Sequence, residues 1–342
     1  MNKVTIIGID LAKSVFHVHG ATDSGAVVFR KKLARSQLPQ FMAAQPSCVV
    51  VTEACAGAHY WAREMTRLGH TPKLIAPCYV KPFIKRQKND AADAEAIVEA
   101  AQRPNMRFVE PKTAEQQARA TVFRVREKFV NQRTELINAL RAHMHEFGYV
   151  APKGIGKLGG LEEIIEDENT ELPDIVRELG RDLLEQIGQL TARIDALKVK
   201  INALSRQAET SRRLQTMPGV GAISALAIET FAPPMESFKS GRDFAAWLGL
   251  VPRQKTTGGK PRLGRTSKMG QRDIRRLLII GAMAVIRWAA RNGPPEGSWL
   301  ARMMARKPRM VVAIALANKM ARGIWAMMTK HEDYRNPAMG AA

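Results

Sequence analysis

The sequence predicts an α/β domain, then a long helical region, then a mostly helical C-terminal domain. Residues 3–104 alternate β-rich and helical segments. Residues 113–212 carry apolar residues at helical spacing and few β-branched clusters, and the segment from 213 to about 335 holds shorter amphipathic helices. Together these observations divide the 342 residues into three domains: 1–104, 105–212 and 213–342.

The first domain begins with three consecutive β-rich runs and continues with alternating helices and strands. This order is that of the ribonuclease-H-like fold, although the pattern alone is compatible with several α/β arrangements. The expected strands are 4–10, 14–21, 26–34, 48–53 and 71–77, and the expected helices are about 36–44, 58–69 and a helix that starts at Asp90.

The middle region reads as two long helices joined by a glycine-rich segment, residues 154–160, that breaks the helical pattern. In the second helix Leu183, Leu190, Leu197 and Leu204 recur every seven residues. Such a stripe is typical of an antiparallel helical hairpin or a coiled coil. We therefore assign packing or dimerisation to this region, and no catalysis.

The third domain opens with a segment, 216–231, that has the form of a helix-hairpin-helix turn. Gly219 and Gly221 would let backbone amides approach a phosphate there, but a tight turn without a ligand explains the same residues. Trp288 and Trp325 lie at helical spacing among apolar residues and are expected in the core. The other expected elements are a helix at 241–249, a glycine-rich basic loop at 251–273, an amphipathic helix from about Asp273 and a last helix at 310–328.

The composition is strongly basic. Lys and Arg number 53 against 32 Asp and Glu, which gives a formal net charge of +21 and a pI near 10.3. Residues 253–330 alone contain 18 Lys and Arg against two Asp and Glu. This excess predicts a polyanionic partner such as a nucleic acid.

Neither the cysteines nor the apolar segments point to an oxidising compartment or a membrane. Cys48, Cys55 and Cys78 are odd in number and lack paired metal-ligand spacing, which favours reduced thiols. The longest uninterrupted apolar run, 277–286, is too short to span a bilayer, and the chain leads directly into a strand without a signal peptide. We expect a protein that stays in solution.

Four acidic residues lie where predicted strands end or a predicted helix begins. Asp10 and Glu53 end strands, and Asp90 and Asp93 open a helix. Carboxylates that converge from separate elements repel one another unless a cation neutralises them. Oxygen ligands without His or Cys favour Mg²⁺, with Mn²⁺ as the alternative, over zinc. Acids in a first helical turn also complement the helix dipole, which is the simpler interpretation of Asp90 and Asp93.

Ser267 is the second candidate, because it lies in the most basic part of the chain. A serine is a weak nucleophile unless a base removes its proton and cations stabilise the charge at phosphorus. The same residue is also explained by capping the next helix or by binding a phosphate. The predicted nucleic-acid-binding residues around it are Arg253, Lys255, Lys260, Arg262, Arg265, Lys268, Arg272, Arg275 and Arg276.

Six segments resemble one known family. Residues 8–13, 52–64 and 79–97 are similar to the N-terminal half of the DEDD transposases of the insertion-sequence one-hundred-ten family. Residues 216–225, 244–282 and 312–326 resemble that family's C-terminal transposase domain, so the likeness covers nearly the whole chain.

The resemblance implies more than the residues alone. It implies an N-terminal domain like a Holliday-junction resolvase, with Asp10, Glu53, Asp90 and Asp93 as the tetrad that binds Mg²⁺. It also implies that Ser267 attacks DNA and becomes covalently linked to it. Thr266 stands where the family pattern has an apolar residue, which leaves two adjacent hydroxyls.

The same resemblance implies partners and a location. Members of the family recombine DNA under the guidance of a structured RNA encoded by the element. They work as dimers or tetramers in which one subunit's acidic domain meets another's serine domain. The expected location is the bacterial cytoplasm, with the protein on the nucleoid when it is bound to DNA, and no membrane is involved.

Our hypothesis is therefore a transposase or site-specific recombinase that forms a covalent phosphoserine intermediate with the help of Mg²⁺. The alternative is a structure-selective, metal-dependent DNA endonuclease that uses water as nucleophile. A third interpretation is a non-enzymatic basic binding protein with a coiled-coil dimeriser. A covalent protein–DNA species separates the first two, and metal dependence separates both from the third.

Overall fold

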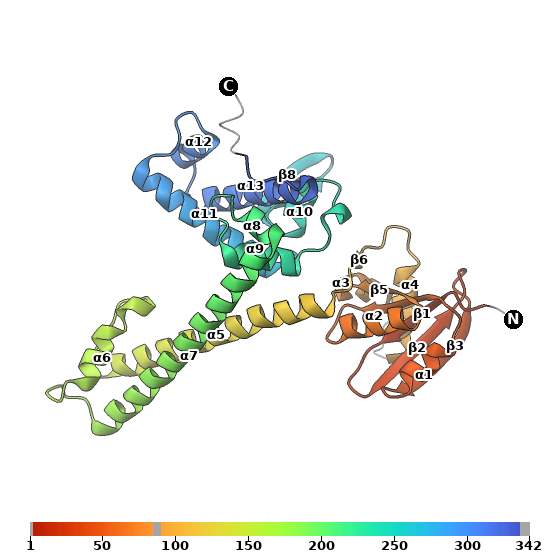
Figure 1. Ribbon diagram of the computed structural model, residues 1–342, viewed down its shortest axis with the longest axis horizontal. Coiled ribbons are helices and arrows are strands. Elements are labelled where there is room, and N and C mark those ends of the chain that lie inside the picture. The colour runs from red at the N-terminus through yellow and green to blue at the C-terminus, as the bar shows by residue number, and fades with distance from the viewer. Residues whose placement is uncertain (1–2, 85–89, 336–342) are drawn as a thin grey trace. The chain divides into compact units, whose positions relative to one another are not determined.

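The computed structural model describes residues 3–84 and 90–335 (Figure 1). The chain forms two compact units, Met1–Gln117 and Ala118–Ala342. The N-terminal unit is a mixed α/β structure built on one sheet, and the C-terminal unit is mostly helical. Both features agree with the sequence-based prediction of the fold class.

The N-terminal unit contains a six-stranded sheet with the order β3-β2-β1-β4-β5-β6. Strand β1 is antiparallel to β2, which is antiparallel to β3, whereas β1, β4 and β5 run parallel. The short β6 is antiparallel to β5. The strand bounds are β1 Ile6–Asp10, β2 Val15–Ala21, β3 Val27–Ala34, β4 Val49–Glu53, β5 Thr71–Ile75 and β6 Phe108–Val109.

Helices cover both faces of this sheet. Ile7 and Ile9 of β1 pack in one apolar cluster with side chains of α1 and α2. Ile6 of β1 and Val51 of β4 pack in another cluster with side chains of α4. Because successive strand residues alternate between faces, the α4 face is also the face of Asp10 and Glu53. The helices are α1 Leu38–Ala43, α2 Ala58–Arg67, α3 Pro77–Val80, the 3₁₀ turn η1 Lys81–Phe83 and α4 Asp90–Ala101.

Two long helices, α5 Ala114–Glu146 and α7 Asp174–Gln207, are joined through η2 Ile155–Lys157 and the short α6 Gly159–Glu166 (Figure 1). The buried residues of α7 that recur every seven positions are Ile187, Ile194 and Ile201. Each follows one of the leucines of the sequence pattern by four residues, and those leucines are half-buried. The stripe therefore has the alternating four-and-three spacing of a heptad, with its isoleucine side turned inward.

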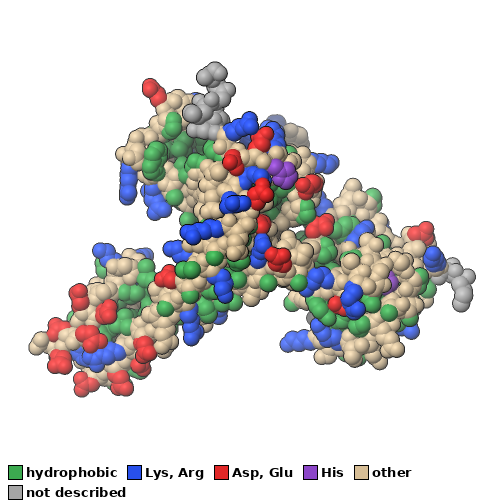
Figure 2. Space-filling model, viewed as in Figure 1, with side chains coloured by type: hydrophobic (Ala, Val, Ile, Leu, Met, Phe, Trp, Pro, Cys, Tyr) green, Lys and Arg blue, Asp and Glu red, His purple; other side chains and the backbone are tan. Residues whose placement is uncertain are grey.

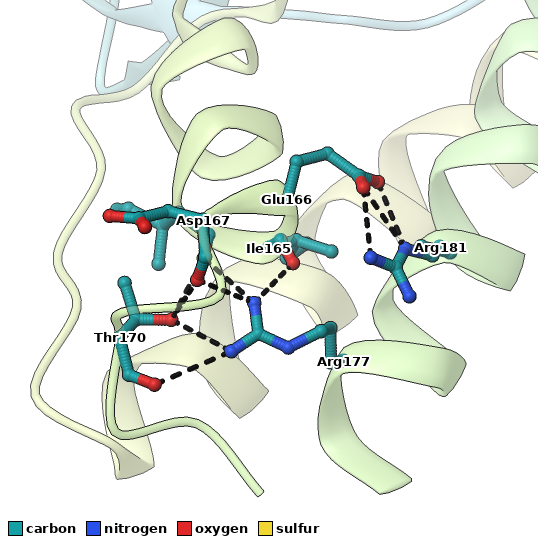
Figure 3. A network of polar contacts seen from close by, with 7 residues as sticks. Ile165, Glu166, Asp167, Thr170, Arg177 and Arg181 are labelled. Atoms are coloured by element: carbon teal, nitrogen blue, oxygen red, sulfur yellow. Dashed lines mark hydrogen bonds and ion pairs between the residues drawn. The ribbon is translucent and has the colours of Figure 1, made fainter. Parts of the chain in front are cut away.

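A buried arginine joins the end of α6 to α7 (Figure 3). The Arg177 guanidinium, 8% exposed, donates to the carbonyl oxygens of Ile165 and Asp167 and, at 3.0 Å, to the Thr170 hydroxyl. It thereby satisfies carbonyls that the end of a helix leaves without partners. Its neighbour Arg181 pairs with Glu166 at 2.9 Å on the surface instead.

The rest of the C-terminal unit packs around one core, in which Ile228, Phe244, Leu278 and Ile324 are fully buried. Among the described residues, α13 is the one helix that is long and apolar enough to cross a bilayer. Its apolar side chains, however, form part of this core. The elements are α8 Glu209–Leu214, α9 Ala222–Phe231, η3 Met235–Ser237, α10 Gly241–Trp247, β7 Pro252–Thr257, β8 Lys260–Thr266, α11 Arg272–Asn292, α12 Trp299–Arg306 and α13 Arg309–Lys330.

The basic segment expected as a loop at 251–273 is largely an antiparallel hairpin of β7 and β8. Gly258 and Gly259 connect the strands with φ of 58° and 75°. Two successive positive φ angles are typical of a type I′ turn, whose twist matches that of the flanking strands. The prediction of a loop was wrong because the basic residues masked a short two-stranded pattern around the glycine pair.

The turn before α9 is shaped by close packing. Gly219 has φ of 85°, and a Cβ on Gly281 of α11 would lie 2.0 Å from the Gly219 carbonyl oxygen. The two glycines therefore let this turn lie directly on the α11 backbone. This close packing explains why residue 219 is a glycine. It does not explain Gly221, because a Cβ there would meet no atom within 4 Å.

Candidate active site

Two of the predicted carboxylates end neighbouring parallel strands. In the register of β1 and β4, Ile9 lies opposite Thr52, so Asp10 and Glu53 are the next pair. Helix α4 crosses the same face close to the backbone, because Gly8 has no side chain: a Cβ there would lie 2.6 Å from the Ala94 carbonyl oxygen. Asp93 is the residue before Ala94, so the fold brings it toward the ends of both strands.

The electrostatics of Glu53 show that these carboxylates influence one another. Burial raises the pKa of the Glu53 carboxyl, and the charges of Asp10 and Asp93 raise it further. The pKa of the nearby Cys55 thiol is raised by burial and by the charges of Glu53 and Asp10. Three carboxylates from β1, β4 and α4 thus share one electrostatic environment, in which a cation would relieve their repulsion.

Asp90 is the first residue of α4, and its side chain lies outside the described residues. It precedes Asp93 by three positions, a spacing that places two residues on the same side of a helix. Among the side chains that are described, no three His, Cys, Asp or Glu gather closely enough to enclose a metal ion. The donors on this face are carboxylate oxygens, and their mutual repulsion fits Mg²⁺ or Mn²⁺ as the missing counter-charge.

Sequence reasoning undervalued one neighbour of this cluster. His17 of β2 is paired with Asp10 across the antiparallel β1–β2 ladder, so the two side chains share a face. His19, opposite Gly8, is 2% exposed, and burial lowers its pKa. From the sequence, two alternating histidines on a strand indicate no more than packing or surface positions, and His19 is buried as a packing residue would be. The register of the strands is the signal that singles out His17.

Ser267 lies in a tight loop directly after β8. Its backbone N–H donates to the Val251 carbonyl oxygen at 2.8 Å, and the Lys268 N–H donates to the Gly249 carbonyl oxygen at 3.2 Å. A Cβ on Gly270 would lie 1.8 Å from the Trp247 carbonyl oxygen, so this position has no room for a side chain. The loop is thus held against residues 247–251 by backbone contacts.

Arg275 fastens the same loop. Its Nη1 donates to the carbonyl oxygens of Leu248 at 2.9 Å and Met269 at 2.8 Å, which join the two sides of the loop. Partial burial, and next the charge of Arg272, lowers the pKa of this guanidinium. We predicted Arg275 as a nucleic-acid contact from charge alone, and the structure gives it these internal bonds. The sequence did not predict that Arg275 would join the two sides of the loop.

The Ser267 hydroxyl oxygen is buried and makes no hydrogen bond with the described residues. An unpartnered buried hydroxyl is uncommon, and such groups often occur where a ligand or a reaction completes the site. The adjacent Thr266 ends β8 opposite Pro252. The structure therefore distinguishes the two adjacent hydroxyls: the Ser267 oxygen is buried without a partner among the described residues, and the Thr266 oxygen is not such an atom.

The predicted basic residues surround this loop on the C-terminal unit. Lys255, Lys260, Arg262 and Arg265 are exposed on the hairpin, as is Arg253, and Lys268 and Arg272 are exposed beside it. Arg276 is exposed too, although it pairs with Glu127 at 3.3 Å. Figure 2 shows acidic side chains gathered instead around α6 and the adjoining end of α7. Residues 253–276 contain nine Lys and Arg against one Asp, so the basic excess is concentrated in the sequence around Ser267, as an interface with a polyanion requires.

Comparison with known proteins places both units in one family. Residues 7–148 match the sequence model of IS110-type DEDD transposases. Residues 211–294 match the model described as the transposase IS116/IS110/IS902 family. The first match contains the four carboxylates, and the second contains Ser267 and its basic surroundings.

Similar proteins extend over nearly the full chain. A probable family 20 transposase of Pseudomonas aeruginosa is 47% identical over 96% of this chain and 98% of its own length. The transposase for insertion sequence element IS1328 of Yersinia enterocolitica is 41% identical over 96% of this chain and 98% of its own length. The transposase for insertion sequence element IS1111A of Coxiella burnetii is 35% identical over 98% of this chain and 92% of its own length. With its carboxylate sheet edge and its basic C-terminal unit, the chain belongs to the IS116/IS110/IS902 family of insertion-sequence transposases, enzymes that cleave and rejoin DNA.

Proposed function

We propose that this transposase cleaves DNA through a covalent phosphoserine intermediate, with a divalent metal held by its carboxylates. Membership among the DEDD transposases already implies dependence on a divalent metal. The observation that supports the metal site is that Asp10 and Glu53 end neighbouring parallel strands on the sheet face that α4 crosses; burial, and then the charges of Asp10 and Asp93, raise the pKa of the Glu53 carboxyl there. Carboxylates that repel one another at the end of a sheet are prepared for a cation.

Asp10, Glu53 and Asp93, together with Asp90, are the residues that would hold Mg²⁺ or Mn²⁺. The metal would polarise the scissile phosphate and favour deprotonation of an attacking hydroxyl. The strand order β3-β2-β1-β4-β5, with α4 over the carboxylates, supports a ribonuclease-H-like fold of the kind found in Holliday-junction resolvases. We keep 1–104, 105–212 and 213–342 as the proposed domains, with 1–104 as the metal-binding domain.

Ser267 is the proposed nucleophile. Its oxygen attacks phosphorus, its proton passes to a basic group, and the phosphodiester bond to the leaving deoxyribose oxygen breaks. The phosphoserine retains the bond energy, so a second hydroxyl can later displace the serine and rejoin a strand. Arg272 and the exposed hairpin cations would hold the DNA backbone and stabilise the charge that develops on the phosphate.

The carboxylates and the serine lie on different compact units, which is compatible with an active site assembled from two subunits. We propose a dimer or tetramer in which the carboxylates of one copy meet Ser267 of another. We also propose that a structured RNA of the element guides the choice of DNA, which rests on the family resemblance and on the basic charge. As a bacterial insertion-sequence transposase, the protein is expected in solution in the cytoplasm, on the nucleoid when it is bound to DNA.

One observation favours the alternative endonuclease with water as nucleophile: the Ser267 oxygen is buried, so attack requires the loop to open. Cleavage of DNA that carries the element ends tests the two mechanisms. We expect wild type to cut in Mg²⁺ and not in EDTA, and both Asp10→Asn and Ser267→Ala to be inactive. Cleavage by Ser267→Ala that still needs Mg²⁺ would support the water mechanism instead.

A further inference from the structure

A large apolar cavity lies in the C-terminal unit at the opposite end of α11 from Ser267. Its volume is about 1320 Å³, and it is formed by the end of α11, the segment that leads into α12, and α13. This exceeds the roughly 300–1,000 Å³ typical of small-molecule sites. Sixteen residues of α11 separate Arg272 from Trp288, or about 24 Å of helix, so the cavity is distinct from the Ser267 loop.

Three indole rings line the cavity: Trp288, Trp299 and Trp325. We predicted Trp288 in the core, and this was wrong, since 61% of its surface is exposed. Trp325 is fixed by a hydrogen bond from its Nε1 to the Met235 carbonyl oxygen at 3.3 Å. Trp288 is thus exposed beside an apolar hollow that the half-buried Trp299 and Trp325 also line, and such an arrangement is typical of a binding surface, because water solvates indole faces poorly.

Cations border this aromatic surface. The Lys319 ammonium lies 5.1 Å from the centre of the Trp299 ring, a cation–π contact, and Arg242, Arg322 and Lys330 also line the cavity. Of the acidic residues there, Glu332 pairs with Arg335 at 3.8 Å and Asp333 with Arg213 at 4.0 Å. Glu296 is the third acid of the lining. The cations therefore outnumber the acids around the indoles.

Aromatic faces bordered by cations are the combination that binds unpaired nucleotides. Bases stack on indole rings whatever their sequence, and the backbone phosphates between them need positive charge. A base-paired duplex keeps its base faces stacked inside, so it cannot use the indoles. An apolar peptide would fill the hollow but would leave the cations around the indoles without a role.

We propose that this cavity binds a short unpaired stretch of DNA or RNA, with bases stacked on Trp288 and Trp299 and phosphates near Lys319 and Arg322. The proposal rests on the family's action on nucleic acid and does not depend on the serine mechanism. Helix α11 would then have the Ser267 loop at its N-terminal end and a binding site for an unpaired strand at its C-terminal end.

Photocrosslinking tests the site directly with the full-length protein. A single-stranded thymidine oligonucleotide that carries one 5-iodouracil is irradiated with the protein, and the attached peptide is identified by mass spectrometry. The uridine RNA of the same sequence forms the second arm, and the paired duplex is the control. We expect attachment at Trp288 or Trp299 with the unpaired strand only, and the arm that reacts more strongly identifies the source. Attachment confined to residues 253–276 would overturn the proposal.

Matched variants give an independent measurement. Trp299→Ala and Lys319→Gln should each weaken binding of the single strand, by about tenfold for the tryptophan, and leave duplex binding within about twofold. Phe147→Ala removes an aromatic residue that is 42% exposed at the end of α5. It should change neither single-strand binding nor duplex binding. Circular dichroism establishes that each variant is folded. Unchanged single-strand binding by both cavity variants would contradict the proposal, and a simultaneous loss of oligomers would identify a protein interface instead.

Discussion

Gly8 of β1 lies so close to Ala94 of α4 that a Cβ on the glycine would come within 2.6 Å of the alanine carbonyl oxygen. The same Cβ would lie 2.6 Å from a methyl carbon of Val98. The absence of a side chain at Gly8 therefore sets how closely α4 crosses the sheet. Asp93 reaches the neighbourhood of Asp10 and Glu53 because of this contact.

Gly8→Ala should separate α4 from β1 and disperse the carboxylates. We expect a loss of about 1–3 kcal/mol in the free energy of unfolding, together with loss of DNA cleavage. Gly188→Ala is the control, because Gly188 lies within α7 and a Cβ there meets no atom within 4 Å. That change should stabilise the protein by up to about 1 kcal/mol. Urea unfolding and a cleavage assay measure both effects, and full activity of Gly8→Ala would contradict the role of the contact.

Glu53→Gln should stabilise the metal-free protein at neutral pH. The folded-state pKa of Glu53 is raised, so the stability that it contributes is complete at acid pH and is lost as the pH rises through that pKa. The glutamine has no charge to lose, so its advantage over wild type should be present at pH 7 and should disappear near pH 4. Thermal unfolding in EDTA measures this difference across that range.

Added Mg²⁺ should reverse the order of stability. Wild type should gain in melting temperature because the ion binds the folded carboxylates, and Glu53→Gln should gain little. Equal melting temperatures of wild type in Mg²⁺ and in EDTA would argue against a metal at this sheet edge.

Arg275→Lys should reduce cleavage more than DNA binding. A lysine keeps the charge but lacks the planar guanidinium that joins the Leu248 and Met269 carbonyl oxygens. The Ser267 loop should then lose its fixed geometry, with cleavage falling by about tenfold or more. Arg287→Lys is the matched control, because Arg287 is exposed on the same helix, α11, and has no assigned contact with DNA or with the Ser267 loop. Binding measured by gel shift should be alike for both variants; a parallel loss of binding by Arg275→Lys would assign the residue to DNA contact instead.

Arg177→Ala and Arg181→Ala should differ in stability although the residues are neighbours on α7. Removal of the buried Arg177 leaves the Ile165 and Asp167 carbonyls without that donor, at a loss of about 2–4 kcal/mol. Arg181 forms an exposed ion pair, so its removal should change stability by less than about 1 kcal/mol. Equal effects in urea unfolding would contradict the structural role of Arg177 shown in Figure 3.

Much of the N-terminal unit could be predicted because its strands obey local rules. The buried strands are apolar runs bounded by turn residues, and helix α2 ends just before Gly69, so pattern alone located β1 to β5 and the helices α1, α2 and α4. It did not predict the short elements α3, η1 and β6. The carboxylates were found in the same way, since Asp10 and Glu53 interrupt apolar strands at their ends. What the pattern could not supply was the register that pairs His17 with Asp10, because pairing depends on the whole sheet.

In the C-terminal unit the missing parts depend on contacts between distant residues. The Gly258–Gly259 pair was a readable hairpin signal, but the charges around it favoured a loop interpretation. The close approach of Gly219 to Gly281, sixty-two positions apart, and the carbonyls gathered by Arg177 arise only from tertiary packing. The exposure of Trp288 also depends on tertiary packing, because helical spacing in the sequence does not tell which helices cover a given face.

The most direct test of the central claim is to trap a covalent protein–DNA species in cells. The chain is expressed with its native flanking DNA, the cells are lysed in denaturant, and DNA attached to the protein is measured for wild type, Ser267→Ala, Thr266→Ala and Asp10→Asn. We predict an adduct with wild type and Thr266→Ala, and none with Ser267→Ala or Asp10→Asn. Cut DNA without any adduct, or an adduct that persists in Ser267→Ala, would contradict a phosphoserine intermediate at Ser267.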